Sequence, residues 1–570
     1  MSAWVSALRR PQVRRRLVAA GILPAAIALA AVYWTALRTP AVGAFHDDGI
    51  YAVTAKALAT GRGYRILSLP GENRQTKYPF LFPALLAAVW KMAPRFPDNV
   101  VFLKSVPLAC AMLWWFLSYQ LIRRETRSRH VAAAVTLLTA VSPWILFLST
   151  ALLSETLFAA LVTGALLLIR QTEHGEESLH SVWGAGLAAG AACLTRAAGI
   201  ALIPAGAWAL SGRGKRRDAV IFILLASAAC LPWVRWQFQH SHASLESYYS
   251  ERNYAAWNIL LHFAPSQKLK IAGQNAVGAL VAPGVLMGSP ASGWGALGAL
   301  LLGVLTVAGL VRRIVRKPGV IELFTIFYST LIILWAWPPM RFFAPLLPVL
   351  LLSAYEGVKT TVRALAWGPR AAQVLLAGAA VALAAQSGWV TADDIAQARM
   401  HGSLKLPNTP QDDWREMARL TSWLQRNTPP DAVLMGNLDP VLYLYSGRKS
   451  VRGFTADPFL LHYSDERNRQ PLGGAEEMLE TMRRYRVAYL VQMPNAAFRE
   501  GAYLSRLDCE LVTSHPELFR LVYESNQGRY RIYATALDRH LDRLGFKPNF
   551  QNGTPLITSN QIGIRVTDRN

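Results

Sequence analysis

Long apolar stretches without a charged residue recur along this chain, and short clusters of arginine and lysine separate them. The first stretch, Leu17 to Leu37, is 21 residues long, which is enough to cross a bilayer as one helix. Backbone groups inside a bilayer must find partners within the chain, so continuous apolar runs of this length are expected to form helices. Together with a hydrophobic content of 52%, the runs predict a polytopic α-helical membrane protein.

The basic clusters predict which side of the membrane each loop occupies. Arg14, Arg15 and Arg16 precede the first run, and an excess of positive charge marks the cytoplasmic side. We therefore expect a cytoplasmic N-terminus, and we expect the net charge of +24 to reflect topology rather than nucleic-acid binding. A cleaved signal peptide is the alternative, but its apolar region usually has only about 7–15 residues. The further clusters lie at 123–129, 213–217, 312–317 and 359–370.

If all clusters are cytoplasmic, an even number of spans must separate each from the next. Val131 to Ile169 would be roughly 58 Å long as one helix, about twice the hydrocarbon thickness, so it should be a hairpin with Glu155 at its outer apex. The same parity makes Ser181 to Leu210 a second hairpin with Arg196 facing outward. Each of these hairpins contains one charged residue.

A third hairpin is predicted at Leu323 to Tyr355, where Pro338 and Pro339 break the run and Arg341 follows the break. The three hairpins thus present three lone charges to one face. Single spans complete a count of about eleven, with the C-terminus outside. These spans are Val100–Ile122, Ala219–Val234, Ser292–Val311 and Ala371–Ala392.

The remaining sequence divides into outer loops and a polar end. Residues 1–392 are expected to form the transmembrane part, with a first outer loop at 38–99 and an aromatic-rich outer loop at 235–291. Pro79 to Met92 is too short to cross and should lie in the outer interface. Residues 393–570 predict an extracytoplasmic α/β domain. Its expected helices are 412–426 and 474–485, and its expected strands are 432–435, 487–492, 519–524 and 530–535.

Two adjacent carboxylates, Asp47 and Asp48, follow the first span by about ten residues and suggest chemistry at the outer surface. The alternative is a helix cap for residues 49–59, because Asp is favoured at that position. No Gly-rich phosphate loop and no His/Cys metal spacing is present in the sequence. This excludes transport driven by a built-in nucleotide-binding domain.

The run Asp47-Asp48-Gly49-Ile50-Tyr51-Ala52, with Lys77-Tyr78-Pro79 after it, resembles the first outer loop of the GT-C glycosyltransferases. It is most similar to the branch that contains protein O-mannosyltransferases and the lipid A aminoarabinose transferase. Asp48 departs from the usual Glu, and Tyr78-Pro79-Phe80 departs from Pro-Pro-Leu. Three later motifs match in order, so that the resemblance covers residues 1–358: Leu153-Ser154-Glu155, Leu194-Thr195-Arg196, and Arg341 before Pro345 and Pro348.

The resemblance implies transfer of a sugar from a polyprenyl-phosphate carrier to an acceptor hydroxyl, with inversion at the anomeric carbon. Asp47 would be the base, because a carboxylate beside a second one in a low-dielectric cleft has a raised proton affinity. Asp48 would orient the acceptor or share the proton, and Glu155 would complete the catalytic carboxylates. The donor phosphate would be bound by Lys77, Arg196 and Arg341, and the substrates by His46, Tyr51 and Tyr78.

The resemblance implies no obligatory metal, although Asp47, Asp48 and Glu155 could hold Mg²⁺ or Mn²⁺ through their oxygens. Glu155 is alternatively a solvated turn, and Arg196 and Arg341 are alternatively its structural partners. His46 is alternatively a local hydrogen-bonding neighbour.

There are two rival functions. One is a transporter or flippase for the same kind of lipid, and the other is an inactive scaffold of a polysaccharide assembly complex. The expected partners are a polyprenyl-phosphate sugar, a lipid, glycan or protein acceptor, and membrane lipids, without nucleic acid. An Ala- and Arg-rich composition predicts a bacterial inner membrane, with the polar end in the periplasm.

Overall fold

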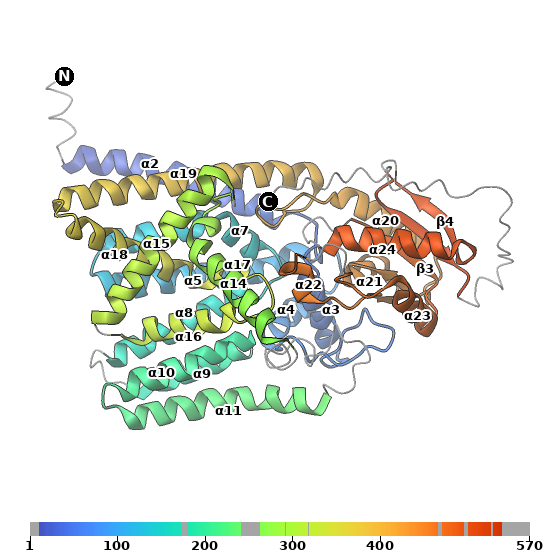
Figure 1. The fold of residues 1–570 in the computed structure, drawn as a ribbon, viewed down its shortest axis with the longest axis horizontal. Helices are drawn as coiled ribbons and strands as arrows, with labels where there is room; N and C mark the ends of the chain where they lie inside the picture. Colours follow the sequence, from blue (N-terminus) through green and yellow to red (C-terminus); the bar gives the residue numbers. More distant parts are fainter. Residues whose placement is uncertain are drawn as a thin grey trace, which may run out of the picture.

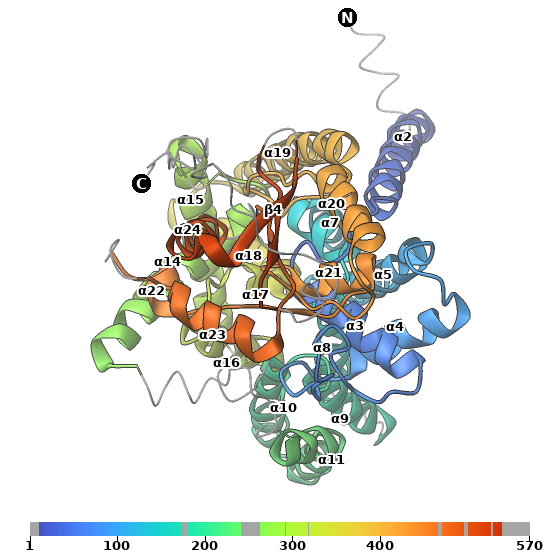
Figure 2. The same cartoon turned by 90° about the vertical axis from the view of Figure 1, so that its right-hand side faces the viewer.

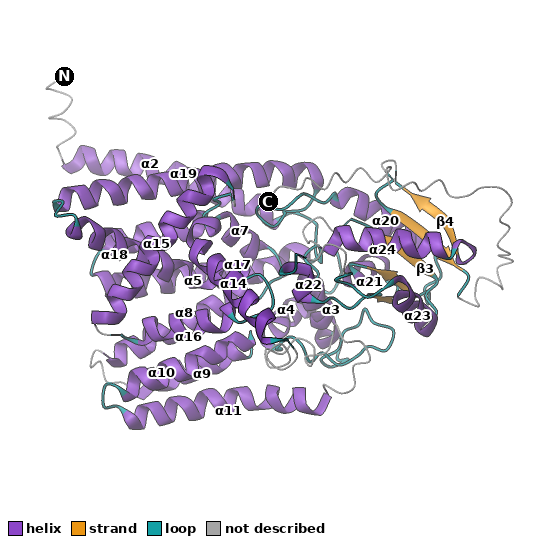
Figure 3. Ribbon diagram, viewed as in Figure 1, coloured by secondary structure: helices purple, strands orange, loops and turns teal. Residues whose placement is uncertain are grey.

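The computed structural model describes residues 11–173, 179–240, 263–290, 292–316, 318–465, 470–494, 500–525 and 528–537. Long helices run side by side through most of the molecule, and a small sheet lies beyond one end of them (Figure 1 and Figure 3). Most of the predicted aromatic part of the loop 235–291 and the chain after residue 537 lie outside the described residues.

The helical part is built from long and broken helices. The bounds are α2 (Pro11–Leu37), α3 (Asp47–Ala59), α4 (Leu81–Met92), α5 (Val100–Thr126), α6 (Arg129–Val141), α7 (Pro143–Thr150), α8 (Glu155–Glu173), α9 (Leu179–Cys193), η1 (Ala197–Ala201), α10 (Leu202–Ser211), α11 (Arg216–His240), α14 (Pro265–Leu286), α15 (Gly293–Arg316), α16 (Val320–Ile333), α17 (Met340–Phe343), η3 (Ala344–Leu346), α18 (Leu347–Ala364) and α19 (Pro369–His401).

Within the described residues, seven helices are long and apolar enough to cross a membrane, or eight if α6 and α7 form one span bent by 65°. Shorter apolar helices accompany them, so the predicted total of about eleven stays a prediction. All three expected hairpins are broken where the sequence indicated. The chain leaves helix at 151–154, at 194–196 and at 334–339.

The helix α14 was not predicted, and it lies within the expected outer loop 235–291. This helix has the length and composition of a membrane span. Lys268, Lys270 and Asn275 interrupt its apolar pattern, and this conceals it in the sequence. Asn275 is buried at 1% exposure, and its amide donates to the carbonyls of Ile333 and Trp335 at 3.1 and 2.7 Å.

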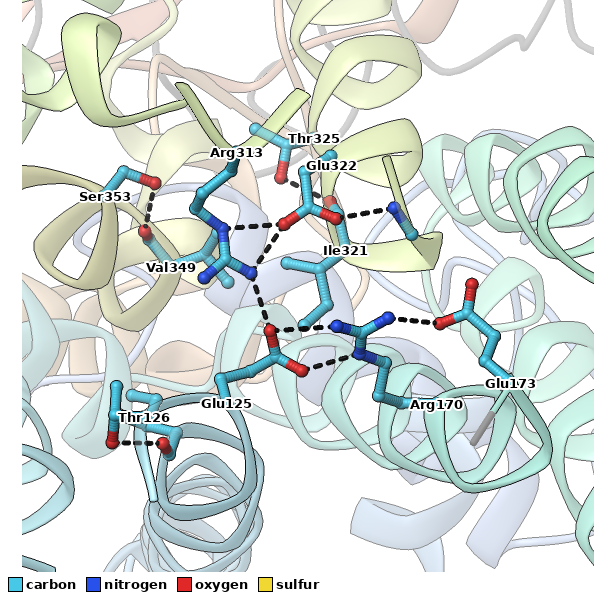
Figure 4. A network of polar contacts seen from close by, with 12 residues as sticks. Glu125, Thr126, Arg170, Glu173, Arg313, Ile321, Glu322, Thr325, Val349 and Ser353 are labelled. Carbon is cyan, nitrogen blue, oxygen red and sulfur yellow. Dashed lines mark hydrogen bonds and ion pairs between the residues drawn. The ribbon is translucent and has the colours of Figure 1, made fainter. Parts of the chain in front are cut away.

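Ion pairs join the basic clusters (Figure 4), at the end of the bundle away from the sheet (Figure 1). Glu125 accepts from Arg170 Nε at 2.6 Å and from Arg313 Nη2 at 2.8 Å, which ties α5, α8 and α15 together. The clusters 123–129 and 312–317 therefore share one end, as the parity of the spans requires. Which side of the membrane this end occupies stays a prediction.

The chain after α19 forms a five-stranded sheet with the strand order β2-β1-β3-β5-β4. The strands β2, β1 and β3 are parallel, and β5 is antiparallel to both β3 and β4. The bounds are α20 (Trp414–Asn427), β1 (Leu434–Gly436), α21 (Asp439–Ser446), β2 (Ser450–Val451), α22 (Pro458–His462), α23 (Ala475–Tyr485), β3 (Tyr489–Gln492), α24 (Glu500–Ser514), η4 (Pro516–Leu518), β4 (Phe519–Glu524) and β5 (Arg531–Thr535).

Alternate residues of the strands face two separate cores, as the two-residue period of a strand dictates. Leu434 and Val491 pack with α20 and α21, whereas Met435 and Leu490 pack with α23 and α24. The four predicted strands are confirmed within two residues, and the two-residue β2 was missed. Because α19 continues to His401, no structural break marks residue 393, and the predicted division into domains stays a prediction.

Candidate active site

Asp48 faces the loop that precedes α3. One carboxylate oxygen accepts from the Gly43 N–H at 2.6 Å and the other from the Phe45 N–H at 3.0 Å. Burial raises the pKa of Asp48 to about 6, although these backbone hydrogen bonds and Lys104 oppose the shift. Because both oxygens bond the loop, the structure gives no support to the expectation that Asp48 orients the acceptor or shares the proton.

Asp47, the first residue of α3, projects toward other charged groups. The Tyr78 hydroxyl donates to Oδ1 at 2.6 Å, and Arg341 Nη1 donates to Oδ2 at 2.7 Å. Burial alone would raise the pKa of Asp47, but Arg341 and Lys77 together with the Tyr78 hydroxyl hold it well below its usual range. The structure therefore contradicts the expected raised proton affinity of Asp47, and of the two carboxyl groups it is Asp48 whose pKa is raised.

Glu155 links the two arginines that were predicted to bind phosphate. Its Oε1 accepts from Arg341 Nε and from Arg196 Nη1, the latter at 2.7 Å. Ser154 accepts a further bond from Arg196 at 3.2 Å. Glu155 is 2% exposed, and its Oε2 has no hydrogen-bond partner among the described residues. It is therefore a buried carboxylate that orients guanidinium groups, and the alternative of a solvated turn is wrong.

Positive charge is in excess at this point. Arg341, Arg196 and Lys77 are three cations, while Asp47 and Glu155 are two carboxylates. Coulomb attraction in a partly buried site is stronger than in water. The cluster can thus bind an anion without an additional cation.

Each of the three cations lies close to an aromatic ring. The Arg341 guanidinium lies 4.6 Å from the centre of the Phe45 ring, and Arg196 lies 5.3 Å from that of Phe342. Lys77 Nζ lies 4.9 Å from the ring of Tyr78. Cation–π attraction of this kind favours the charged groups and fixes their planes.

Six of the nine predicted site residues meet in this cluster: Asp47, Lys77, Tyr78, Glu155, Arg196 and Arg341. Tyr51 lies beside it, but it is 2% exposed and its hydroxyl is 3.0 Å from Ser154 Oγ. His46 turns away and its Nε2 lies 3.0 Å from Asp439 Oδ1. Burial and internal hydrogen bonds therefore argue against direct substrate contacts by Tyr51 and His46.

Sequence reasoning missed Ser154 and Asp439 as parts of this region. Ser154 stood inside the motif before Glu155 and could have been found there. Asp439 lies far along the chain, and only the position of α21 beside α3 brings it close (Figure 2).

The three carboxylates that were named as a possible metal site do not converge on one point. Asp48 bonds the loop backbone, and Glu155 bonds two arginines. Among the described residues, no group of three His, Cys, Asp or Glu side chains is arranged to hold a metal ion.

Comparison with known proteins identifies the fold. Neither a family model nor a curated protein matches the sequence. The structure of ArnT from Cupriavidus metallidurans bound to undecaprenyl phosphate matches with a TM-score of 0.54 at 13% identity, over 91% of this chain and 99% of that chain. ArnT from the same organism in the apo state matches with a TM-score of 0.55 at 13% identity, over 92% and 99%.

The archaeal oligosaccharyltransferase AglB from Archaeoglobus fulgidus is less similar. It matches with a TM-score of 0.45 at 13% identity, over 85% of this chain and 70% of that chain. The ArnT structures show that this chain shares the ArnT fold. This likeness is to the fold alone, and it agrees with the fold expected from the resemblance.

Proposed function

We propose that this protein is a membrane glycosyltransferase that moves a sugar from a polyprenyl-phosphate carrier to an acceptor hydroxyl, with inversion at the anomeric carbon. One observation carries the proposal: charged residues from four separate segments meet at the end of the bundle that adjoins the sheet. The first outer loop supplies Asp47 and the three hairpins supply Glu155, Arg196 and Arg341. Unlike the paired charges around Glu125, the charges here include more cations than carboxylates.

The donor phosphate would bind to Arg341, Arg196 and Lys77. Guanidinium groups donate paired N–H bonds to phosphate oxygens, and lysine adds a point charge. As the bond between the sugar and the phosphate breaks, negative charge grows on the leaving oxygen, and fixed cations stabilise it. The ArnT structure bound to undecaprenyl phosphate supports this kind of ligand.

Asp47 would take the proton of the acceptor hydroxyl as its oxygen attacks the anomeric carbon. The neighbouring cations hold the pKa of Asp47 down. A bound phosphate would neutralise part of that charge and compete for the N–H groups of Arg341, so the burial of Asp47 would then raise its proton affinity. The donor would thereby prepare the base for the acceptor.

Glu155 and Asp48 would serve as positioning groups. Glu155 holds two guanidinium groups by one oxygen, and Asp48 holds the loop before Asp47 through backbone N–H groups. No metal is required for these steps.

The site would face the periplasm of a bacterial inner membrane, where lipid-linked sugars are presented. The polar residues from 393 onward would lie on that side, and the acceptor would be a lipid, a glycan or a protein.

Transfer from synthetic polyprenyl-phosphate sugars tests the proposal, with the purified chain in detergent and a panel of sugars and acceptors. We expect a glycosylated product and free polyprenyl phosphate in equal amounts. A flippase would instead move the lipid across a liposome membrane without forming product, and a scaffold would do neither. Translocation without product for every donor would contradict the proposal.

A further inference from the structure

His46, the residue before Asp47, is held in an unusual backbone conformation. Its φ is 61° and its ψ is −57°, and the Asp47 N–H donates to the Phe45 carbonyl at 2.7 Å. These values describe a γ-turn of the rare kind with positive φ, which is strained for a residue with a side chain. Such strain persists only where the surrounding structure enforces it.

Asp439 in α21 supplies a contact that can enforce the turn. Its Oδ1 lies 3.0 Å from His46 Nε2, and the side chains of Asp439 and His46 are 0% and 5% exposed. Burial lowers the pKa of His46, and because a carboxylate only accepts, the hydrogen of this bond lies on Nε2. The second oxygen of Asp439 has no hydrogen-bond partner among the described residues. A buried carboxylate with one unpaired oxygen is costly, and the hydrogen bond with His46 is the contact that the structure gives its other oxygen.

Helix α21 is itself docked tightly on the loop and on α3. A side chain at Gly43 would come within 2.5 Å of Val441, and one at Gly49 would come within 2.7 Å of Pro440. The approach is therefore possible only because both positions lack a Cβ atom. The backbone carbonyl of Asp439 also accepts from Ser450 Oγ at 2.5 Å, which fixes the start of α21 to β2.

We propose that Asp439 is a positioning residue for the reaction: through His46 it holds the γ-turn that directs the Asp47 carboxylate toward Arg341 and Tyr78. The sheet-bearing part of the chain would thus complete a site whose reacting groups all lie in the helical part. This inference rests on the proposed function, because it assigns Asp439 a role in that same site.

The test compares Asp439→Ala with Asp439→Asn in the transfer assay. The alanine removes the acceptor for His46, so the turn relaxes, and kcat should fall about tenfold or more while KM for the donor changes less than about twofold. Asparagine keeps an oxygen acceptor in the same place and should retain most of the activity. Tyr445→Phe is the matched control, because the Tyr445 hydroxyl bonds the Pro40 carbonyl across the same interface without touching His46.

A second variant separates positioning from simple docking. Glycine adopts positive φ without strain, so His46→Gly added to Asp439→Ala should recover several-fold activity over Asp439→Ala alone. If Asp439 only helped the two parts to dock, the glycine would bring no recovery and Tyr445→Phe would be equally damaging. Either of those results would overturn the inference while leaving the transfer activity in place.

Hydrogen exchange of the backbone amides of residues 43–50 gives a readout that needs no substrate. Asp439→Ala should speed exchange at the Asp47 amide, and Tyr445→Phe should not. Absence of product from the wild type would remove the proposed function alone, whereas unchanged exchange in Asp439→Ala would remove the positioning role alone.

Discussion

The neighbouring carboxylates Asp47 and Asp48 have opposite pKa shifts because their side chains point in different directions and meet different partners. Asp47 meets cations and a hydroxyl, and its pKa is lowered. Asp48 enters the loop, and burial raises its pKa to about 6. A sequence places the two residues side by side but says nothing of these directions, so the cluster could be predicted and the division of roles could not.

Asp48→Asn tests the structural role through pH. The Asp48 carboxyl has a pKa of about 6 in the folded state, against an ordinary value of 3.8 when the chain is unfolded and the group is exposed to water. It therefore binds more protons when folded, so its contribution favours folding at low pH and is lost between about pH 4 and 6. Asparagine does not titrate. We expect the difference in Tm between wild type and Asp48→Asn, measured in detergent, to shift in favour of the variant as pH rises through that window. A pH-independent difference would contradict the assignment.

Arg341 and Arg196 can be tested by charge-conserving changes. Lysine keeps the charge but loses the fork of N–H donors, and each lost charge-assisted bond is worth roughly 1.5–3 kcal/mol, or about ten- to hundredfold in rate. Alanine should cost more. Transfer rates of Arg341→Lys and Arg341→Ala measure this directly, with Arg363→Lys, an exposed residue near the other end of the bundle, as the control. Rates equal to those of the wild type would remove Arg341 from the site.

On the scale of elements, broken helices carry the site residues. The sequence indicated the three breaks beside Glu155, Arg196 and Arg341, but not the bend of 65° between α6 and α7. Overlong apolar runs with one charge each predicted turns at Glu155, Arg196 and Arg341, and the structure confirms all three. The helix α14 was missed because polar residues interrupt its apolar pattern. The pattern of the sequence does not show that such residues can be buried with hydrogen-bond partners inside the protein. Asn275, for example, is satisfied by the carbonyls of α16 and of the break after it.

Asn275 offers a test of how the Arg341 break is held. Its Nδ2 donates to Ile333 and Trp335, and its Oδ1 accepts from the Tyr463 hydroxyl at 2.9 Å. Asn275→Ala leaves buried polar groups without partners, which costs about 1–3 kcal/mol for each. We expect a clearly lowered Tm and a reduced transfer rate. Tyr463→Phe keeps both carbonyl contacts and leaves only Asn275 Oδ1 without its partner, so it should lower the Tm less. An unaltered Tm in Asn275→Ala would show that the break is held by other contacts.

On the scale of the whole molecule, the sheet lies at one end of the bundle (Figure 1), and ion pairs join the basic clusters at the other end. The distribution of arginine and lysine made this polarity predictable. How the sheet meets the first outer loop was not predictable, because α21 and α3 are separated by hundreds of residues and no local pattern links them.

Accessibility of single cysteines tests this polarity in a background without the four natural cysteines. In intact cells, a cysteine in place of Glu480, on the exposed face of α23, should react with an impermeant thiol reagent, whereas one in place of Arg217 should react only after lysis. Reaction at residue 217 in intact cells would reverse the proposed orientation.

Asp47→Asn provides the most direct measurement of the central claim, that Asp47 accepts the proton of the attacking hydroxyl. The amide keeps the size of the side chain and an oxygen for Tyr78, but it cannot act as a base. We predict that transfer from the polyprenyl-phosphate sugar falls by at least about a thousandfold, while the Tm and its increase on adding polyprenyl phosphate stay close to those of the wild type. Normal turnover by Asp47→Asn would contradict the account.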